Sequence, residues 1–396
     1  MNSNTNHPAV RRWWSFALLY LGYMLLFADR TVMNLSLAYI GKDFHVGAAA
    51  LGATASAFFL GYTIMQIPGG YLTDRLGSKW MIVGSLLVWS LMTMLTGLAW
   101  SVAALIVIRF FFGIAEGPYP AAALKKLSED YPADKKSQVT SALISSNYAG
   151  AALAPVIIVP VMAASGWRHS FVWLGIFGII IMGAYYLLER PFHRNKVSSN
   201  AAKKIVLKEI DPRVWAFVVI GLALNVITKG LETWMPVYFL QERGINLKNL
   251  AWLVPLPVIA GGIAALISGF VMVHLFKGHE RWMITIASLL TLVCMYGLFK
   301  STSLVWVVTF DVLTYFVKSL AFTGIFSFTA QILTEKTYGS SIGIVNFGGQ
   351  LGGFIGPLLI GWIVQATASY SMAFLGLVIS ACLAVVACLF ISKNKA

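Results

Sequence analysis

Twelve long apolar runs, separated by short polar breaks, constrain this chain more than any other feature. A transmembrane helix needs about 20 apolar residues, whereas a transmembrane barrel strand has about 10 residues of alternating polarity. The runs are continuous and of helical length, and only 11% of the chain is charged, against about 25% in a soluble domain. The sequence therefore excludes a water-soluble globular protein and predicts an all-α protein in a lipid bilayer. The expected spans are 13–36, 48–72, 80–99, 101–124, 136–162, 166–189, 213–240, 249–275, 281–300, 303–333, 340–366 and 369–392.

The longest polar stretch, from Glu189 to Arg213, follows the sixth run and divides the chain in two. A division of this kind favours two six-helix halves. We therefore predict an N-terminal half at 1–189, a cytoplasmic linker at 190–212 and a C-terminal half at 213–396. Twelve spans in one chain can form a complete translocation path, so a monomer is expected.

The positive charge of the chain is distributed unevenly among the loops. Of the 29 lysines and arginines, 20 lie in segments on the side of the N-terminus, five in the opposite loops and four inside spans. Cytoplasmic loops of membrane proteins carry such an excess. Both termini are therefore predicted to be cytoplasmic, and the net charge of +14 reflects membrane topology rather than affinity for nucleic acid.

Motifs of enzymes and metal sites are missing from the sequence. The three cysteines lie within apolar runs and form no CxxC pair. No HExxH motif is present, and the six histidines lie mostly in loops or at span ends. We expect neither an enzyme nor a bound cofactor or metal, and no pore-loop filter indicates a channel.

Eight ionisable residues fall inside the predicted spans. A charge at the centre of a bilayer costs about 2.5–3.5 kcal/mol or more, so each needs a partner or a water-filled cavity. So many in an apolar chain indicate a polar path through the protein. They are Asp29, Arg30, Arg109, Glu116, Lys229, Glu232, Asp311 and Lys318.

In the first half, Arg109 and Glu116 lie two helical turns apart on one face, about 10 Å from each other and too far to pair. Arg109 could hold an anion through its guanidinium, and Glu116 could bind a proton reversibly. Asp29 and Arg30 diverge by about 100° on their helix and should serve different partners, Asp29 as a second proton carrier and Arg30 as a second anion clamp. The alternative is a structural charge network, or a position at the membrane interface for Asp29 and Arg30.

In the second half, Lys229 and Glu232 are three residues apart and can neutralise each other. Alternatively, Lys229 meets a second anionic group of a substrate. Asp311 and Lys318 are again two turns apart, with Lys318 as the candidate binding residue and Asp311 as a distant counter-charge.

Uncharged polar and aromatic residues also occur within the spans. Asn147 and Asn346 lie in glycine-rich spans and are candidate contacts for a sugar-like ligand, while Tyr62 and Trp234 are candidate cavity residues. The alternative is that these residues join helices by hydrogen bonding and packing.

The segment between the second and third spans reads Gly70-Tyr-Leu-Thr-Asp74-Arg75-Leu-Gly77-Ser-Lys79. It resembles the loop signature G-x-x-x-D-R-x-G-x-[KR] of the major facilitator superfamily. The glycines allow a tight turn, the cations hold the cytoplasmic side, and Asp74 is expected near a helix N-terminus. The resemblance implies two six-helix halves that alternate in access to a site between them.

Other motifs narrow the resemblance. The fourth span contains Arg109-Phe-Phe-Phe-Gly-Ile-Ala-Glu116-Gly, and the eleventh contains Asn346-Phe-Gly-Gly-Gln-Leu-Gly-Gly. Nearly the whole chain resembles the anion:cation symporter family, which implies proton-coupled uptake of a small organic anion, such as a sugar acid, across a bacterial cytoplasmic membrane.

The resemblance also implies roles for individual residues. Asp29 and Glu116 match the family's protonatable carboxylates, and Arg30 and Arg109 match its anion-handling arginines. Tyr62 matches a cavity tyrosine, and Asn147 falls near a substrate-binding amide. Lys229 and Lys318 depart from the family pattern and leave the substrate open. An exchanger or exporter of organic anions on the same fold, and Na⁺ in place of H⁺, remain alternatives.

Overall fold

The computed structural model describes residues 8–189, 211–332 and 335–391 and is helical throughout this part, with no strand. Most helices follow the expected spans to within a few residues. In chain order they are α1 (Pro8–Asp43), α2 (Ala48–Leu76), α3 (Ser78–Gly97), α4 (Val102–Glu116), α5 (Tyr119–Asp130), α6 (Ala133–Leu188), α7 (Arg213–Gln241), α8 (Leu247–Leu253), α9 (Pro255–Leu275), α10 (Glu280–Lys300), α11 (Leu304–Ile332), α12 (Glu335–Thr367) and α13 (Tyr370–Cys388).

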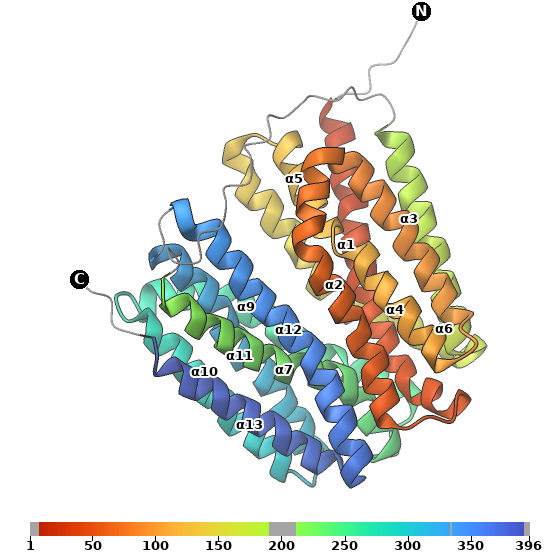
Figure 1. The fold of residues 1–396 in the computed structure, drawn as a ribbon, viewed down its shortest axis with the longest axis vertical. Helices are drawn as coiled ribbons and strands as arrows, with labels where there is room; N and C mark the ends of the chain where they lie inside the picture. Colours follow the sequence, from red (N-terminus) through yellow and green to blue (C-terminus); the bar gives the residue numbers. More distant parts are fainter. Residues whose placement is uncertain (1–7, 190–210, 333–334, 392–396) are drawn as a thin grey trace, which may run out of the picture. The chain divides into compact units, whose positions relative to one another are not determined.

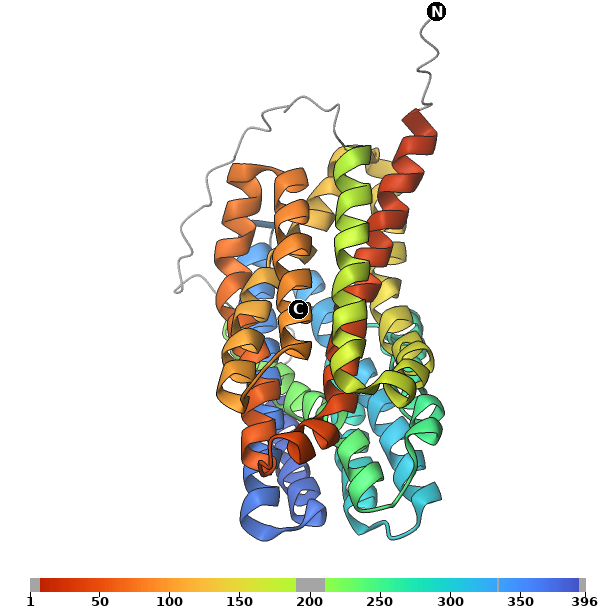
Figure 2. The ribbon, with the colours of Figure 1, turned by 90° about the vertical axis from the view of Figure 1, so that its right-hand side faces the viewer.

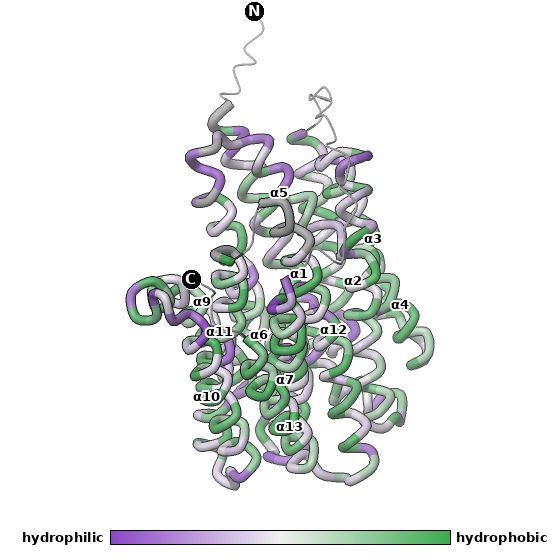
Figure 3. The backbone as a smooth tube through the Cα atoms, turned by 60° about the vertical axis from the view of Figure 1, so that its left-hand side comes forward, coloured by the Kyte–Doolittle hydropathy of each residue, from purple (hydrophilic) through white to green (hydrophobic). Residues whose placement is uncertain are grey.

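The described residues contain 11 helical segments long and apolar enough to cross a membrane. The longest runs through all of α6, which bends at Gly166, where φ is 84°. Because this bend falls at the start of the second of the two runs expected at 136–162 and 166–189, α6 supplies two spans and the prediction of twelve is confirmed. Hydrophobic residues dominate helices such as α7, α10 and α13 (Figure 3).

Two of the spans are interrupted rather than continuous. The fourth is made of α4 and α5, which break at Gly117 and Pro118 directly after Glu116. The eighth is made of α8 and α9. The tight turn expected near residue 100 is present, and the Ser101 side chain accepts a hydrogen bond of 3.1 Å from the backbone N–H of Ala104, which caps α4.

The chain forms two compact units. The N-terminal unit comprises Met1–Met33 and Leu60–Ala202, and the C-terminal unit comprises Asn34–Phe59 and Lys203–Ala396. The C-terminal unit thus includes the end of α1 and the first part of α2. Most of the expected linker at 190–212 lies outside the described residues, so the division into halves at that segment stays a prediction.

Within the N-terminal unit, α3 packs along α6 and α4 (Figures 1 and 2). Glycines allow α2 to approach α4 more closely than larger residues would. A Cβ atom at Gly61 would lie 2.1 Å from the carbonyl oxygen of Phe110, and one at Gly117 would lie 3.3 Å from that of Tyr62. This close approach brings the end of α4, with Glu116, against the part of α2 that carries Tyr62.

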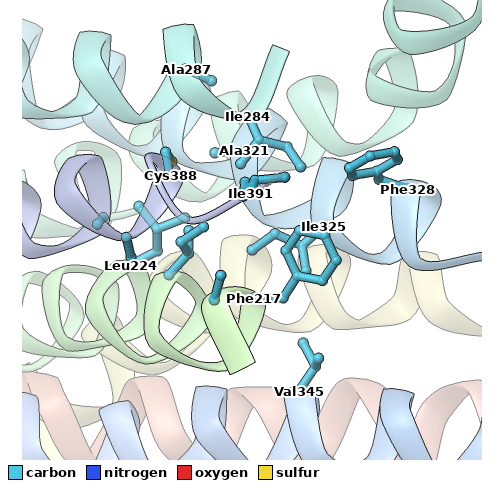
Figure 4. Close-up of a cluster of buried hydrophobic side chains, with 14 of the residues drawn as sticks. Phe217, Leu224, Ile284, Ala287, Ala321, Ile325, Phe328, Val345, Cys388 and Ile391 are labelled. Atoms are coloured by element: carbon cyan, nitrogen blue, oxygen red, sulfur yellow. The ribbon is translucent and has the colours of Figure 1, made fainter. Parts of the chain in front are cut away.

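Within the C-terminal unit, a buried hydrophobic cluster joins α7, α10, α11 and α13 (Figure 4). Phe217 and Leu224 of α7 pack in it with Ile284 of α10 and Ile325 of α11. Burial of this kind fixes the neighbouring helices through close packing. The cluster lies toward one end of α7 and leaves Lys229 and Glu232 outside it.

A glycine stripe on α12 packs against the backbone of α7. Cβ atoms at Gly348, Gly352 and Gly356 would lie 3.0, 2.3 and 2.5 Å from carbonyl oxygens of α7. The spacing of four residues places all three on one helix face, where small residues permit close helix contact. Gly348 and Gly352 of the motif that begins at Asn346 therefore have a packing role, and they hold Asn346 on a helix that contacts α7.

We expect Gly352→Val to destabilise the protein, because its Cβ would lie 2.3 Å from the carbonyl oxygen of Leu222. Overpacking typically costs about 1–3 kcal/mol. The matched control is Gly343→Val on the same helix, where a Cβ would meet no atom within 4 Å. Thermal unfolding in detergent should show a lower midpoint for Gly352→Val only, and equal midpoints for the two variants would contradict this packing role.

Candidate functional site

Two ion pairs join α1 to α4 inside the N-terminal unit. Arg109 Nη1 donates to Asp29 Oδ1 at 2.8 Å, and Arg30 Nε donates to Glu116 Oε1 at 3.1 Å, with a second contact from Arg30 Nη2 to the same oxygen. Neighbours on α1 therefore serve different partners, as their divergence predicted. Arg109 and Glu116 do not pair with each other, also as predicted, since each takes its partner from α1.

The pair of Asp29 and Arg109 is closed. Each residue is 1% exposed. Thr93 Oγ1 donates to Asp29 Oδ2 at 2.6 Å, and Arg109 Nη2 donates to Thr96 Oγ1 at 3.1 Å. The ring of Phe112 covers the guanidinium at 4.7 Å. Both oxygens of Asp29 are thus engaged, and this arrangement suits a structural link better than an exchangeable anion site.

Thr93 and Thr96 of α3 were not among the residues predicted to contact this pair. A hydroxyl in an apolar helix usually bonds to its own backbone, and both threonines also do so, to the carbonyl oxygens of Trp89 and Met92. The signal that could have found them is their spacing of three residues, which places both on one face of the third span.

The pair of Arg30 and Glu116 is more open. The Arg30 side chain is 13% exposed, while Glu116 is fully buried and its Oε2 has no hydrogen-bond partner. The guanidinium lies 4.8 Å from the ring centre of Tyr62, which is itself buried. Arg30 therefore contacts a buried acid on one side and is partly accessible on the other. An anion that reaches the accessible side could replace the Glu116 carboxylate as the partner of the guanidinium.

Asn147 lies on α6 in the same unit. Its Oδ1 is buried and accepts no hydrogen bond. Three residues further on, α6 packs closely on α1, because a Cβ at Gly150 would lie 2.3 Å from the carbonyl oxygen of Met24. A buried amide oxygen without a donor can accept a hydroxyl from a ligand, since leaving it unpaired is costly.

The candidate residues of the C-terminal unit fall into two groups. Lys229 and Glu232 form an ion pair on α7, and Lys318 of α11 is buried nearby without a salt bridge in the described residues. Trp234, in contrast, donates its indole N–H to the carbonyl oxygen of Pro357 at 3.0 Å and is buried. Its one polar donor is thus used in joining α7 to α12. Asn346 is half-buried on α12.

The signature segment forms the turn between α2 and α3. Gly77, at φ 90°, takes the left-handed conformation that favours glycine and precedes the first residue of α3. Asp74 lies in the last turn of α2, where its Oδ1 contacts Lys125 Nζ at 2.7 Å. Asp74 is thus four residues before the start of α3 at Ser78. The acid near the start of α3 is Glu129, whose Oε2 accepts a hydrogen bond from Ser78 at 2.6 Å.

The other signature residues lie around this turn. Gly70 and Arg75 are in the last two turns of α2, and Lys79 is in the first turn of α3. Lys79 donates to the carbonyl oxygen of Glu189 at 2.6 Å, and the Glu189 carboxylate receives Lys126 at 3.1 Å. The segment thus belongs to a charged network that joins α2, α3, α5 and the end of α6.

No group of three potential metal ligands occurs among the residues at 8–189, 211–332 and 335–391. The three cysteines are free. The described candidate residues could therefore bind a ligand through ion pairs and hydrogen bonds, and they lie on helices rather than in loops.

Comparison with known proteins places these features in a family. The sequence model of the Major Facilitator Superfamily matches residues 19–316 and 278–396. The chain is 28% identical to the hexuronate transporter of Bacillus subtilis, over 93% of this chain and 92% of that protein. It is 26% identical to the probable galactarate/D-glucarate transporter of Escherichia coli K12, over 94% of this chain and 92% of that one.

A solved structure supports the same fold. A bacterial homologue of the human lysosomal transporter Spinster, in an inward-facing and occupied conformation, superposes with a TM-score of 0.82 at 17% identity, and the match covers 96% of each chain. These relatives are transporters rather than enzymes, and the curated ones agree with the resemblance to anion:cation symporters. The chain is an integral membrane protein and belongs to the Major Facilitator Superfamily.

Proposed function

We propose that this protein is a secondary active transporter that takes up a small organic anion, such as a sugar acid, together with protons. The observation that carries the proposal is the pair of Arg30 and Glu116. A partly exposed guanidinium is held there by a fully buried carboxylate that has one oxygen unpartnered. The curated relatives named for sugar acids support the substrate class.

The pair can link proton binding to substrate binding by competition. The substrate carboxylate and the Glu116 carboxylate are both anions that suit the Arg30 guanidinium. A proton on Glu116 removes its charge and weakens the pair, which frees Arg30 for the substrate. Proton and substrate then favour each other's binding, as symport requires.

Asp29 and Arg109 have a supporting role in this proposal. Their closed pair fixes α1 against α4 with Arg30 directed to Glu116. Tyr62 covers the guanidinium of Arg30, and the unpartnered oxygen of Asn147 accepts a substrate hydroxyl. Asn346 is a second candidate for a hydroxyl contact, and Trp234 positions α12 against α7 through Pro357.

The driving force follows from charge. With Glu116 as the proton carrier, import of one monoanion with one proton is electroneutral and is driven by the pH gradient. For each further proton carried, a potential negative inside would contribute about 2.3 kcal/mol per 100 mV. The proposal places a monomer in a bacterial cytoplasmic membrane with both termini inside, as the distribution of lysine and arginine predicts.

We expect Glu116→Gln to abolish uptake driven by a proton gradient, by at least tenfold, while counterflow exchange persists. The amide cannot carry a proton across, but it leaves Arg30 free to bind the substrate. The measurement is uptake of labelled glucuronate or galactonate into proteoliposomes with and without a pH gradient, and Glu242→Gln, at an exposed position, is the control. Loss of both activities would give Glu116 a structural role, and wild-type uptake that needs counter-substrate but no gradient would indicate an exchanger.

We expect Arg30 and Arg109 to fail in different ways when replaced by methionine. Arg30→Met, made together with Glu116→Gln so that no buried carboxylate is left unpaired, should lose ligand binding, measured as the thermal shift with a sugar acid, yet remain folded. Arg109→Met leaves Asp29 buried and unpaired, a change that typically costs about 3–5 kcal/mol. The double variant Asp29→Asn with Arg109→Met should recover part of that stability, because both charges are gone. If Arg109→Met stays stable and loses only binding, Arg109 is the anion clamp instead.

A further inference from the structure

Asp311 of the C-terminal unit is a buried carboxyl group without a partner. The residue lies two turns from the start of α11, is 4% exposed, and its Oδ1 accepts no hydrogen bond. Within the described part of the chain it makes no ion pair, and no charge there offsets its loss of hydration. The two buried acids of the N-terminal unit, Asp29 and Glu116, are each held by an arginine. Asp311 lacks the cation that an acid at membrane depth normally needs.

The neighbouring helices α7, α9 and α10 pack against α11, yet their described residues supply no cation to Asp311. Lys300, at the end of α10, lies with its Nζ 5.0 Å from the ring centre of Phe299. Arg243, which reaches the turn between α10 and α11, donates to the carbonyl oxygen of Thr302 at 2.7 Å. The remaining charged or basic residues of α9, α10 and α12 belong to the opposite end of these helices, where α9 and α11 end and α10 and α12 begin. They are His274, Glu280, Arg281, Glu335 and Lys336.

The polar groups of α7 and of α11 itself are engaged with one another. Lys229 pairs with Glu232 on α7. Those two residues are the charges that act on Lys318, two turns beyond Asp311, and Asp311 is not among them. The expectation that Asp311 is a distant counter-charge of Lys318 therefore gains no support from the contacts. Tyr315, one turn from Asp311, donates its hydroxyl to a backbone carbonyl of α7 at 3.2 Å rather than to the carboxyl group.

A carboxyl group in this setting takes up a proton. An unpaired carboxylate away from water is so unfavourable that the group becomes neutral instead. Glu116 differs, because its charge can be balanced by Arg30. Since no cation holds Asp311, its proton occupancy depends on the surrounding helices alone. A movement of α11 against its neighbours that admits water to Asp311 would release the proton, and renewed burial would bind one again.

We propose that Asp311 is a second proton-binding site, which carries one proton inward in each transport cycle in addition to the proton on Glu116. This inference rests on the proposed function. The Asp311 carboxylate takes the proton from the outside water, and the resulting carboxylic acid returns it to the cytoplasmic water. With one monoanion, the two protons move one net positive charge inward. Uptake then responds to the membrane potential as well as to the pH gradient.

The two acids have unequal roles in such a cycle. Only the loss of the proton from Glu116 restores its pair with Arg30 and completes the cycle, so Glu116 is needed for any net uptake. Asp311 makes no described contact with a residue of the candidate anion site. Its proton therefore adds charge to a cycle that Glu116 governs, and a neutral residue at position 311 should leave that cycle running without the added charge.

The test separates the two driving forces in proteoliposomes with labelled glucuronate. Under a potential negative inside and no pH gradient, accumulation by the wild type should rise by about tenfold for each ~60 mV, as one net positive charge requires. Asp311→Asn, which is neutral and of similar shape, should show no such rise, yet should still respond to a pH gradient through Glu116. Asp311→Glu should restore the response to the potential. Glu242→Gln, at an exposed acid of the same unit, should leave it unchanged.

Infrared spectroscopy of the purified protein provides a readout that does not depend on transport. The C=O stretching band of protonated carboxylic acids should lose a component in Asp311→Asn and keep it in Glu242→Gln. If Asp311→Asn folds poorly, Asp311→Thr, which is also neutral, takes its place in both measurements.

Three results would overturn the second site and leave the proposed function standing. They are an unchanged infrared band in Asp311→Asn, a variant whose uptake still follows the potential or no longer follows the pH gradient, and a wild type whose uptake follows the pH gradient but not the potential. A wild type that responds to neither driving force would overturn both proposals.

Discussion

The ion pairs between α1 and α4 are the constraint on which the N-terminal unit depends. A charge inside a membrane is tolerated only with a partner, and Asp29 and Arg30 project from adjacent positions of one helix in different directions. Each can be matched only if α4 presents a cation and an acid two turns apart, as Arg109 and Glu116 do. The two pairs thereby fix the rotation and the level of α1 on α4. The pair of Asp29 and Arg109 is buried on both sides and forms a rigid link. The pair of Arg30 and Glu116 is partly exposed at Arg30, so an incoming anion could replace Glu116 there.

The two units differ in how they balance charge. The four ionisable residues inside the spans of the N-terminal unit are matched as two pairs. Of the four ionisable residues predicted inside the spans of the C-terminal unit, Lys229 and Glu232 pair, and Lys318 and Asp311 are left without ion partners in the described residues. Unpaired buried charges are costly, and a fold keeps them where a ligand or proton completes them. The excess lysine is therefore better explained by binding than by stability.

The spans could be predicted from the sequence because hydropathy is a property of consecutive residues. The bend of α6 at Gly166 and the turn at Ser101 also lie at the breaks between expected spans. Partners could not be predicted in the same way. The contacts of Arg109 with Asp29 and Thr96 could not be read from the sequence, because partner choice depends on how helices rotate against each other. Gly348 and Gly352 belong to a motif that carries the family resemblance, yet their packing role is seen only in the structure, where the backbone of α7 lies beside them.

Competition between Glu116 and a substrate carboxylate for the Arg30 guanidinium is a simple physical mechanism that couples proton binding to substrate binding. If a proton on Glu116 raises the affinity of Arg30 for a substrate carboxylate, the bound substrate must raise the affinity of Glu116 for a proton by the same factor. No movement of distant residues is needed for this reciprocity, since both anions act on the same side chain. The substrate would then replace an internal carboxylate as the partner of Arg30, and its binding would change the charge that the protein itself presents.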